Sequence, residues 1–410
     1  MQQSIQKKKG KSTWRRINNW LHLWLGLTSG IIVFIVSITG CLYAFQHELS
    51  DLTQPYKFVK AETKPYLSPS QLKAIAAKEA FGVGRDTGIN KIIGISYGSP
   101  EKAALAAFMD KKDGYTMIYI NPYNGTVLKK TALKHDFFRF VLEGHFQLWM
   151  PRKIGQPIVA IGVLIFVVLL ITGLIMWWPK KWNKANRNKS FKIKTDAGPK
   201  RINYDLHNVL GFYAMVIALV IGLTGLVWGF QWFSKSYYFT LTGGKTLPKF
   251  QKGVSDTLLA KTAVLVSPED KVWARMQKEY PEQKGTTQIQ FAYLPADPIT
   301  VIYNPAEGTY YKREFRYFDR YSLAEVKGGG IYGKKFANAS TGEKIYRMNY
   351  DIHVGAVLGL TGKFIAFFAS LICASLPITG FYVWWGKRKK KSGKQVKPAT
   401  KRLPRVAASL

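Results

Sequence analysis

Four long apolar stretches alternate with polar segments along the chain. A helix needs about 20 residues to cross the hydrocarbon core of a bilayer, and each stretch meets or exceeds that length. The cores of the stretches contain no Asp, Glu or Arg, and tryptophans such as Trp177 and Trp385 gather near their ends, as in interfacial belts. We therefore predict a membrane α-helical protein, a four-transmembrane-helix bundle with helices at 21–45, 146–178, 205–233 and 351–385.

Basic residues mark one side of the predicted membrane. The tail 1–20, the loop 179–204 and the tail 386–410 are rich in Lys and Arg, and residues 179–201 hold nine of them against Asp196 alone. The positive-inside rule places these segments, with both termini, in the cytoplasm of a bacterium. It places the long segments 46–145 and 234–350 on the periplasmic side of the inner membrane. Since much of the net charge of +36 follows this pattern, we expect membrane lipid and not nucleic acid as a partner.

The two periplasmic segments have the pattern of mixed α and β modules. In the first, Ser68 or Ser70 caps an amphipathic helix over 71–81, and a strand at 115–120 leads through the turn 121–125 into a second strand. The second segment repeats this plan loosely. It has a helix from Ser267 to about 279 and strands near 287–293, 299–303, 315–318 and 325–326. We predict two extracytoplasmic α+β modules.

Intervals between histidines and Thr-Gly pairs repeat in the two halves of the chain. The intervals are 17 residues from His22 to Thr39 and from His207 to Thr224, 27 from His145 to Thr172, and 26 from His353 to Thr379. Helix 1 thus matches helix 3 and helix 2 matches helix 4, which indicates an internal duplication. We interpret the Thr-Gly pairs as a repeated helix-packing feature. The alternative, a lipoprotein cleavage box at residues 38–41, would explain only one of the four pairs.

Four of the six histidines stand near the predicted helix starts. Because successive helices run antiparallel, His22 and His207 fall on the cytoplasmic side, and His145 and His353 on the periplasmic side. A low-spin b-type haem needs two neutral imidazoles on opposite faces of its iron. Each pair is therefore a candidate set of axial haem-iron ligands, and the chain is predicted to bind two haem b groups.

Glycines and two further histidines bear on this prediction. A glycine stripe beside the ligands would let a porphyrin approach the backbone, although glycines in membrane helices also mediate close helix packing. His47 and His135 could each displace an outer ligand, but we expect surface roles for them. The glycines concerned are Gly26, Gly30, Gly211, Gly355, Gly359 and Gly362.

These features together resemble a known family, the bacterial PepSY-associated transmembrane helix proteins. The outer modules of that family end in a strand, an Asp-Pro-x-x-Gly turn and a strand, matched here by 120–128 with Asn121 in place of Asp. The second copy, 318–323, keeps Asp319 but lacks the Pro and Gly. The helix-start histidines and Thr-Gly pairs fit too, and the resemblance covers about residues 12–390. It implies PepSY-like modules and, for some members, ferric-siderophore reductases with haem in the bundle; others are described only as iron-regulated membrane proteins.

The first function that fits is a di-haem transmembrane electron-transfer protein, a haem-dependent ferric reductase for iron acquisition. Its acceptor would be Fe(III) in a siderophore or another chelate at the periplasmic face. An anionic complex would dock near the outer histidines, to which Arg152, Lys153 and Lys363 lie close in sequence. The donor must be a quinol or a reductase partner, because the chain has no nucleotide-binding fingerprint.

The second function is that of a haem-free regulatory membrane protein whose PepSY-type modules bind peptides or a peptidase. In that case the histidines would serve only in packing. A transporter is disfavoured, because the helix cores lack the carboxylates and paired charges that mark ion and proton paths. An optical spectrum of the purified protein separates the first function from the second.

Overall fold

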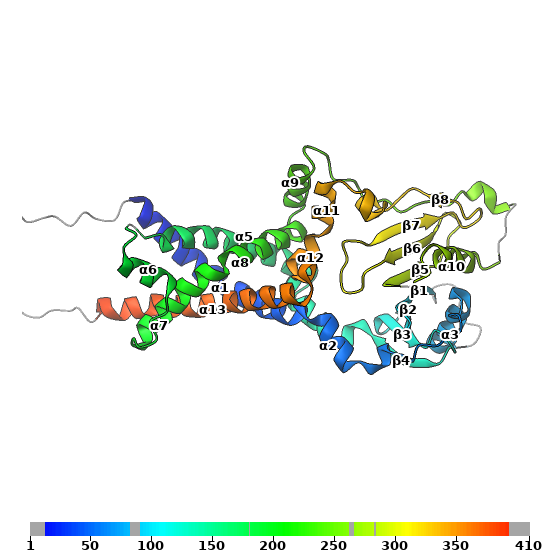
Figure 1. Ribbon diagram of the computed structural model, residues 1–410, viewed down its shortest axis with the longest axis horizontal. Coiled ribbons are helices and arrows are strands. Elements are labelled where there is room, and N and C mark those ends of the chain that lie inside the picture. The colour runs from blue at the N-terminus through cyan, green and yellow to red at the C-terminus, as the bar shows by residue number, and fades with distance from the viewer. Residues whose placement is uncertain (1–12, 83–90, 180, 262–265, 283, 393–410) are drawn as a thin grey trace, which may run out of the picture.

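The computed structural model describes residues 13–82, 91–179, 181–261, 266–282 and 284–392 of the 410-residue chain. The molecule is elongated, with a helical bundle at one end and a sheet domain at the other (Figure 1). The first and last described residues both lie at the end of the bundle away from the sheet. We call this the distal end of the bundle.

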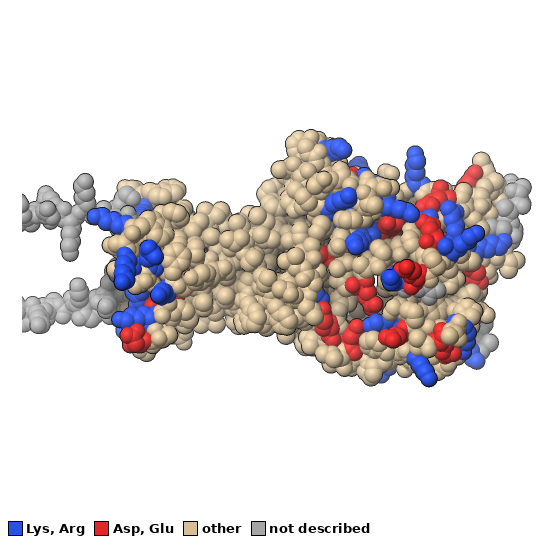
Figure 2. All heavy atoms as spheres, viewed as in Figure 1, with Lys and Arg blue, Asp and Glu red and all other residues tan. Residues whose placement is uncertain are grey.

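Four helical runs in the described chain are long and apolar enough to span a membrane, as predicted. The first and the third each pack against both the second and the fourth, which closes the bundle. On the face shown in Figure 2, the middle of the bundle has no charged atoms, whereas both of its ends do. The runs are α1 (Thr13–Ala44), α5 (Arg152–Trp177), α7 (Pro199–Asp205) with η3 (Leu206–Leu210) and α8 (Gly211–Gly229), and α13 (Gly359–Ser392).

The helix boundaries differ from the predicted ones in a way that matters for the histidines. α5 begins at Arg152 and not at 146, because Leu148 and Trp149 adopt the left-handed conformation and end a separate helix, α4 (Phe137–Gln147). α13 begins at Gly359 and not at 351, because positive φ angles at Gly355 and Gly359 separate it from α12 (Asn349–His353). His145 and His353 therefore lie on short helices of their own beside the bundle.

The other two histidines lie inside helical runs and not at their starts. α1 begins at Thr13 and the third run at Pro199, earlier than the predicted 21 and 205, since a helix can extend through polar residues beyond the hydrocarbon core. His22 is thus within α1. His207 lies in η3, a single π-helical turn between α7 and α8.

Eight strands form one antiparallel sheet in the order β4-β3-β2-β1-β5-β6-β7-β8. The strands β1 to β4 follow α1, and β5 to β8 follow α8. The two sets join at the centre, where β1 pairs with β5 and Ile95 lies opposite Ile289, so both outer segments belong to one sheet. The strands are β1 (Ile92–Tyr97), β2 (Ala104–Asp110), β3 (Gly114–Ile120), β4 (Val127–Ala132), β5 (Thr286–Gln290), β6 (Ile299–Asn304), β7 (Glu314–Phe318) and β8 (Glu325–Val326).

Each outer segment adds one helix to a common core on the sheet. α3 (Pro69–Phe81) contributes Leu72 and α10 (Pro268–Glu279) contributes Trp273 to a single cluster with Ile95 and Ile289. The predicted start of α3 is confirmed: Ser68 and Gln71 form a reciprocal capping box. The predicted hairpin is also confirmed, since residues 121–126 connect β3 to β4.

Short helices fill both ends of the bundle. α6 and α7 lie at its distal end, and α2, α9, α11 and α12 lie between the bundle and the sheet (Figure 1). The remaining short helices of the described chain, some of which lie in the sheet domain, are α2 (Gln46–Thr53), η1 (Pro55–Lys57), η2 (Leu133–His135), α6 (Lys184–Phe191), α9 (Gln231–Leu241), η4 (Thr257–Lys261), η5 (Gly330–Tyr332), η6 (Phe336–Asn338), α11 (Thr341–Arg347) and η7 (Ala356–Leu358).

Candidate functional site

The structure brings the four candidate histidines together as two facing pairs. His22 of α1 faces His207 of η3, with ring centres 6.4 Å apart and ring planes at 84°. His145 of α4 faces His353 of α12, with ring centres 6.1 Å apart and planes at 70°. The first pair is on the distal side of the bundle and the second is next to the sheet domain; we call them the distal and the sheet-side pair. Each pair takes one histidine from each half of the chain.

Each histidine rests on one of the four Thr-Gly pairs, which we call histidine seats. In every case the seat lies on a membrane-spanning helix other than the one that carries the histidine. The ring nitrogen Nδ1 lies within hydrogen-bond distance of the threonine hydroxyl. The four contacts are His22 to Thr172 at 2.9 Å, His145 to Thr39 at 3.2 Å, His207 to Thr379 at 3.0 Å and His353 to Thr224 at 3.0 Å.

These contacts fix the imidazole tautomer. Each threonine hydroxyl donates its one hydrogen to a carbonyl of its own helix, as Thr39 does to Ile35 at 2.7 Å, so its oxygen is left to accept. Nδ1 also faces a carbonyl oxygen in three of the four seats, at 2.9 to 3.1 Å. Because carbonyl oxygens only accept, Nδ1 must carry the proton. The other nitrogen, Nε2, is then the unprotonated one, which is the form in which an imidazole can bind a metal.

The glycine of each seat makes room for the histidine ring. A Cβ atom added at Gly380 would lie 3.1 Å from Cε1 of His207, and the other three seats give 3.1 to 3.3 Å, closer than ordinary van der Waals contact. Threonine thus orients the ring, and glycine lets it approach the helix. The Thr-Gly pairs were interpreted from the sequence as helix packing, but the structure shows that they pack against histidines.

The predicted glycine stripe serves helix packing and turns instead. A Cβ at Gly30 would meet Pro377 at 3.2 Å, and one at Gly211 would meet Leu376 at 3.4 Å. Gly355 and Gly362 contact each other through their backbones, and Gly355 and Gly359 have positive φ. The contacts of Gly30, Gly211, Gly355 and Gly362 are those of the other alternative, close packing of helices.

Three of the seats receive a second hydrogen bond, from asparagines that were assigned no role on the sequence alone. Each lies four residues before a histidine, one helical turn away on the same face. Its Nδ2 donates to the backbone carbonyl of the threonine on which that histidine rests. The bonds are Asn18 to Thr172 at 3.0 Å, Asn203 to Thr379 at 3.0 Å and Asn349 to Thr224 at 3.1 Å. The Asn-Tyr-Asp-x-His pattern common to 203–207 and 349–353 was the available sequence sign of this role.

A mostly apolar cavity of about 240 Å³ is lined by His145 and His353. It also includes the seat glycines Gly40 and Gly225 in its wall. Trp228 lines the cavity too and packs edge-on against His353, with ring centres 5.3 Å apart. Apolar and aromatic walls with a few polar groups are typical of cofactor pockets.

The donor set fits a metal held inside a planar macrocycle. In the part of the chain that the structure describes, no three or more His, Cys, Asp or Glu side chains gather as a metal site. Two facing imidazoles suit a haem iron, whose other ligands come from the porphyrin. A metal–imidazole bond of about 2 Å, with each ring centre about 1 Å further away, puts the ring centres about 6 Å apart. The observed 6.4 and 6.1 Å agree with this spacing.

Comparison with known families adds to this geometry. The sequence model of the PepSY-associated TM region matches residues 19–387. The chain belongs to this family. The matched range contains both histidine pairs and all four histidine seats. No curated protein gives a significant match to the chain.

Three basic residues of this PepSY-associated protein were predicted to dock an anionic complex near the sheet-side pair. Arg152 and Lys153 are exposed at the start of α5, and the Arg152 guanidinium lies over the Phe146 ring at 5.3 Å. Lys363 is 5% exposed, and its Nζ lies 2.6 Å from Glu48. Its burial and its ion pair remove Lys363 from the predicted docking surface.

The two remaining histidines lie apart from the seats. Nε2 of His47 lies 3.1 Å from the Tyr310 hydroxyl, which connects α2 to the loop between β6 and β7. His135 lies exposed in η2. Neither is among the residues that line the cavity.

Proposed function

We propose that this PepSY-associated membrane protein is a di-haem electron-transfer protein with one haem b at each histidine pair. The observation that carries the proposal is the arrangement: four histidines, each with Nδ1 at a threonine hydroxyl, face one another in two pairs with ring centres 6.4 and 6.1 Å apart. Haem, when bound, supplies reversible one-electron chemistry at iron.

The residues of the chain hold and insulate this chemistry. The threonine and carbonyl acceptors keep each ring in one orientation and increase the basicity of Nε2. The asparagine side chains fix the distance between the helix that carries a histidine and the helix that carries its seat. Apolar walls such as those formed by Phe166 and Trp228 exclude water from the sheet-side cavity. Ligand identity, burial and hydrogen bonding to the ligands are the features by which a protein tunes a haem.

The proposed direction of electron flow depends on orientation. We place the distal end of the bundle in the cytoplasm and the sheet domain in the periplasm of the bacterial inner membrane. The exposed Lys and Arg of the 181–201 loop support this, since they lie at the distal end. Reporter fusions at Lys189 and at Lys312 should then report opposite compartments, and the same compartment for both would refute the topology.

The acceptor we propose is Fe(III) in a siderophore or a similar anionic chelate at the periplasmic face. Arg152 and Lys153, exposed at the start of α5 beside the sheet-side pair, provide the positive charge. Reduction to Fe(II) lowers the charge on the metal and weakens its bonds to hard oxygen ligands, which frees the iron. The donor is a separate molecule, a membrane quinol or a reductase partner.

The first experiment asks whether the histidine pairs bind haem. The purified full-length protein should show the oxidised and dithionite-reduced spectra of low-spin b-type haem, at two haems per chain. His207→Ala should remove about half of the haem and leave the sheet-side site. A wild-type protein without haem, after expression with added haem precursor, would favour the haem-free peptide- or peptidase-binding function.

The second experiment tests the acceptor. Dithionite-reduced protein is mixed with ferric siderophores in a stopped-flow instrument, with gallium siderophores as redox-inert competitors. We expect reoxidation that gallium complexes slow and that weakens with salt, because the Debye length is only about 10 Å at 0.1 M. Reoxidation no faster than that of free haem in detergent, unaffected by gallium, would rule out the reductase.

We also propose that the two halves arose by duplication. α1 and α8 each provide the seat for a histidine on a short helix, while α5 and α13 provide the seats for histidines on the long helical runs. Each outer segment adds one helix and four strands to the sheet. Every seat is made within one half and every histidine pair joins both halves, so a single half could build neither site alone.

A further inference from the structure

The four histidines are not held equally. His22, His207 and His353 each share their threonine with an asparagine one turn away. The helix that carries the histidine is therefore bonded to the helix that carries the seat at two points. We call this second bond the asparagine brace. The distal pair has two braces, whereas the sheet-side pair has a brace only at His353.

His145 is the unbraced ligand. The residue four positions before it is Val141, which is 2% exposed and has no side-chain donor for the carbonyl of Thr39. The contact from His145 Nδ1 to the Thr39 hydroxyl is 3.2 Å, the longest of the four. His145 is therefore held to its seat by the ring alone.

The helix that carries His145 is also separate from the membrane-spanning helix that follows it. α4 is separated from α5 by Leu148 and Trp149, whose φ angles of 54° and 56° are uncommon for residues with a side chain. At its other end α4 is joined through η2 to β4, an edge strand of the sheet. His145 thus belongs to a short helix of its own, while His22 is part of a continuous spanning helix.

We propose that His145 is an exchangeable ligand, and that the sheet-side site takes a small neutral π-acceptor ligand in its place when the iron is reduced. This proposal rests on the proposed haem function. In the haem-loaded protein the exchange would break the bond from Fe(II) to Nε2 of His145 and form a bond from Fe(II) to the incoming ligand, with no change of oxidation state and no proton transfer. The imidazole leaves neutral and keeps its Nδ1 hydrogen bond to Val36.

Carbon monoxide is the probe for this site. The full-length protein, loaded with haem and reduced by dithionite, should bind one CO per two haems, seen as a Soret shift in half of the absorbance. Val141→Asn, which supplies the missing brace, should slow CO association by about fivefold, the effect expected of one neutral hydrogen bond. Val141→Thr is the matched control, because its hydroxyl is too short to reach the Thr39 carbonyl, and its rate should equal that of the wild type.

The distal site provides the converse test. Asn18→Ala removes the brace at His22 and should make the distal haem reactive, so that two CO bind per chain. CO binding to both haems of the wild type, or to neither, overturns the proposal. An unchanged stoichiometry in Asn18→Ala together with an unchanged rate in Val141→Asn overturns it as well. Failure of the haem function would appear earlier and separately, as the absence of a Soret band before CO is added.

Discussion

At the histidines, two adjacent residues of a second helix divide one task. The threonine hydroxyl, already donating within its own helix, can only accept, and so fixes the proton on Nδ1. The glycine beside it removes the Cβ that would press on Cε1 of the ring. A Thr-Gly dipeptide, common in membrane helices, thereby decides which nitrogen of a distant histidine carries the proton.

The seat glycines give a prediction at this scale. Gly380→Ala places a methyl group 3.1 Å from Cε1 of His207, so the His207 ring must tilt or shift from its place opposite the His22 ring. We expect the distal haem to be lost or to become high-spin, a change confined to about half of the spectrum. Electron paramagnetic resonance of the oxidised protein measures this directly.

The matched control lies on the same helix. A Cβ at Gly386 has no other atom within 4 Å, so Gly386→Ala should leave both low-spin signals unchanged. Equal spectra for Gly380→Ala and the wild type would show that the seat does not constrain the ring.

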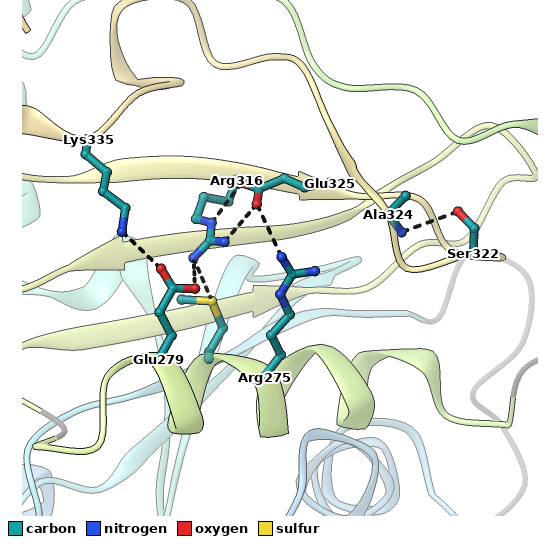
Figure 3. A network of polar contacts seen from close by, with 8 residues as sticks. Arg275, Glu279, Arg316, Ser322, Ala324, Glu325 and Lys335 are labelled. Carbon is teal, nitrogen blue, oxygen red and sulfur yellow. Dashed lines mark hydrogen bonds and ion pairs between the residues drawn. The ribbon is translucent and has the colours of Figure 1, made fainter. Parts of the chain in front are cut away.

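At the scale of elements, a cluster of charges fastens α10 to the sheet. Arg316 of β7 bonds Glu279 of α10 at 2.7 Å and Glu325 of β8 at 2.8 Å, and Lys335 reaches Glu279 at 3.1 Å (Figure 3). Burial alone would raise the pKa of Glu279, but the hydrogen bonds from Arg316 and Lys335 outweigh it and lower the pKa to about 2. The ionised form of Glu279 is therefore stabilised by folding.

This shift predicts a dependence of stability on acid. Because the folded pKa lies below the ordinary value of 4.5, the contribution of Glu279 is present above about pH 4.5 and is lost as the pH falls toward 2. Glu279→Gln should lower the free energy of unfolding of the sheet domain at neutral pH, and the difference from the wild type should shrink as the pH falls through this range. Tryptophan fluorescence during denaturant unfolding measures this free energy, since Trp273 lies in α10 together with Glu279.

Other carboxylates also titrate in this range, so the difference between variants is the quantity to compare. Glu101→Gln, at an exposed position outside the cluster, is the control and should show little change at any pH. A gap between Glu279→Gln and the wild type that stays constant from neutral pH to pH 2 would contradict the assignment.

At the scale of the whole molecule, the two halves are joined twice. In the sheet, β1 of one half pairs with β5 of the other; in the bundle, each histidine pair takes one member from each half. The halves meet in the chain only through the loop that contains α6 and α7. Both the sheet and the candidate sites are therefore properties of the two halves together.

Cutting the chain in this loop tests that dependence. Residues 1–196 or 197–410 expressed alone should show no bis-imidazole haem spectrum, because each half holds only one histidine of each pair. The two fragments expressed together should copurify and recover the spectrum. Full haem binding by one fragment alone would mean that the ligands pair within a half.

The sequence by itself determined the features that depend on local pattern. Four apolar runs of membrane-spanning length, the capping box at Ser68 and the hairpin after β3 were all predicted, because hydrophobic length, caps and turns act over a few neighbouring residues. The repeated spacings likewise indicated which histidines to compare. Even the pairs His22 with His207 and His145 with His353 followed from counting antiparallel crossings.

Only the tertiary structure decided what each local feature touches. Nothing near Thr172 in the chain shows that its hydroxyl meets His22, or that Asn18 holds its carbonyl, since these contacts join separate helices. The burial of Lys363 against Glu48 and the joining of both outer segments through β1 and β5 are likewise long-range. A sequence records the periodicity of each element, but the partner of a side chain depends on how the elements pack, and here that packing turns a Thr-Gly dipeptide into a histidine seat.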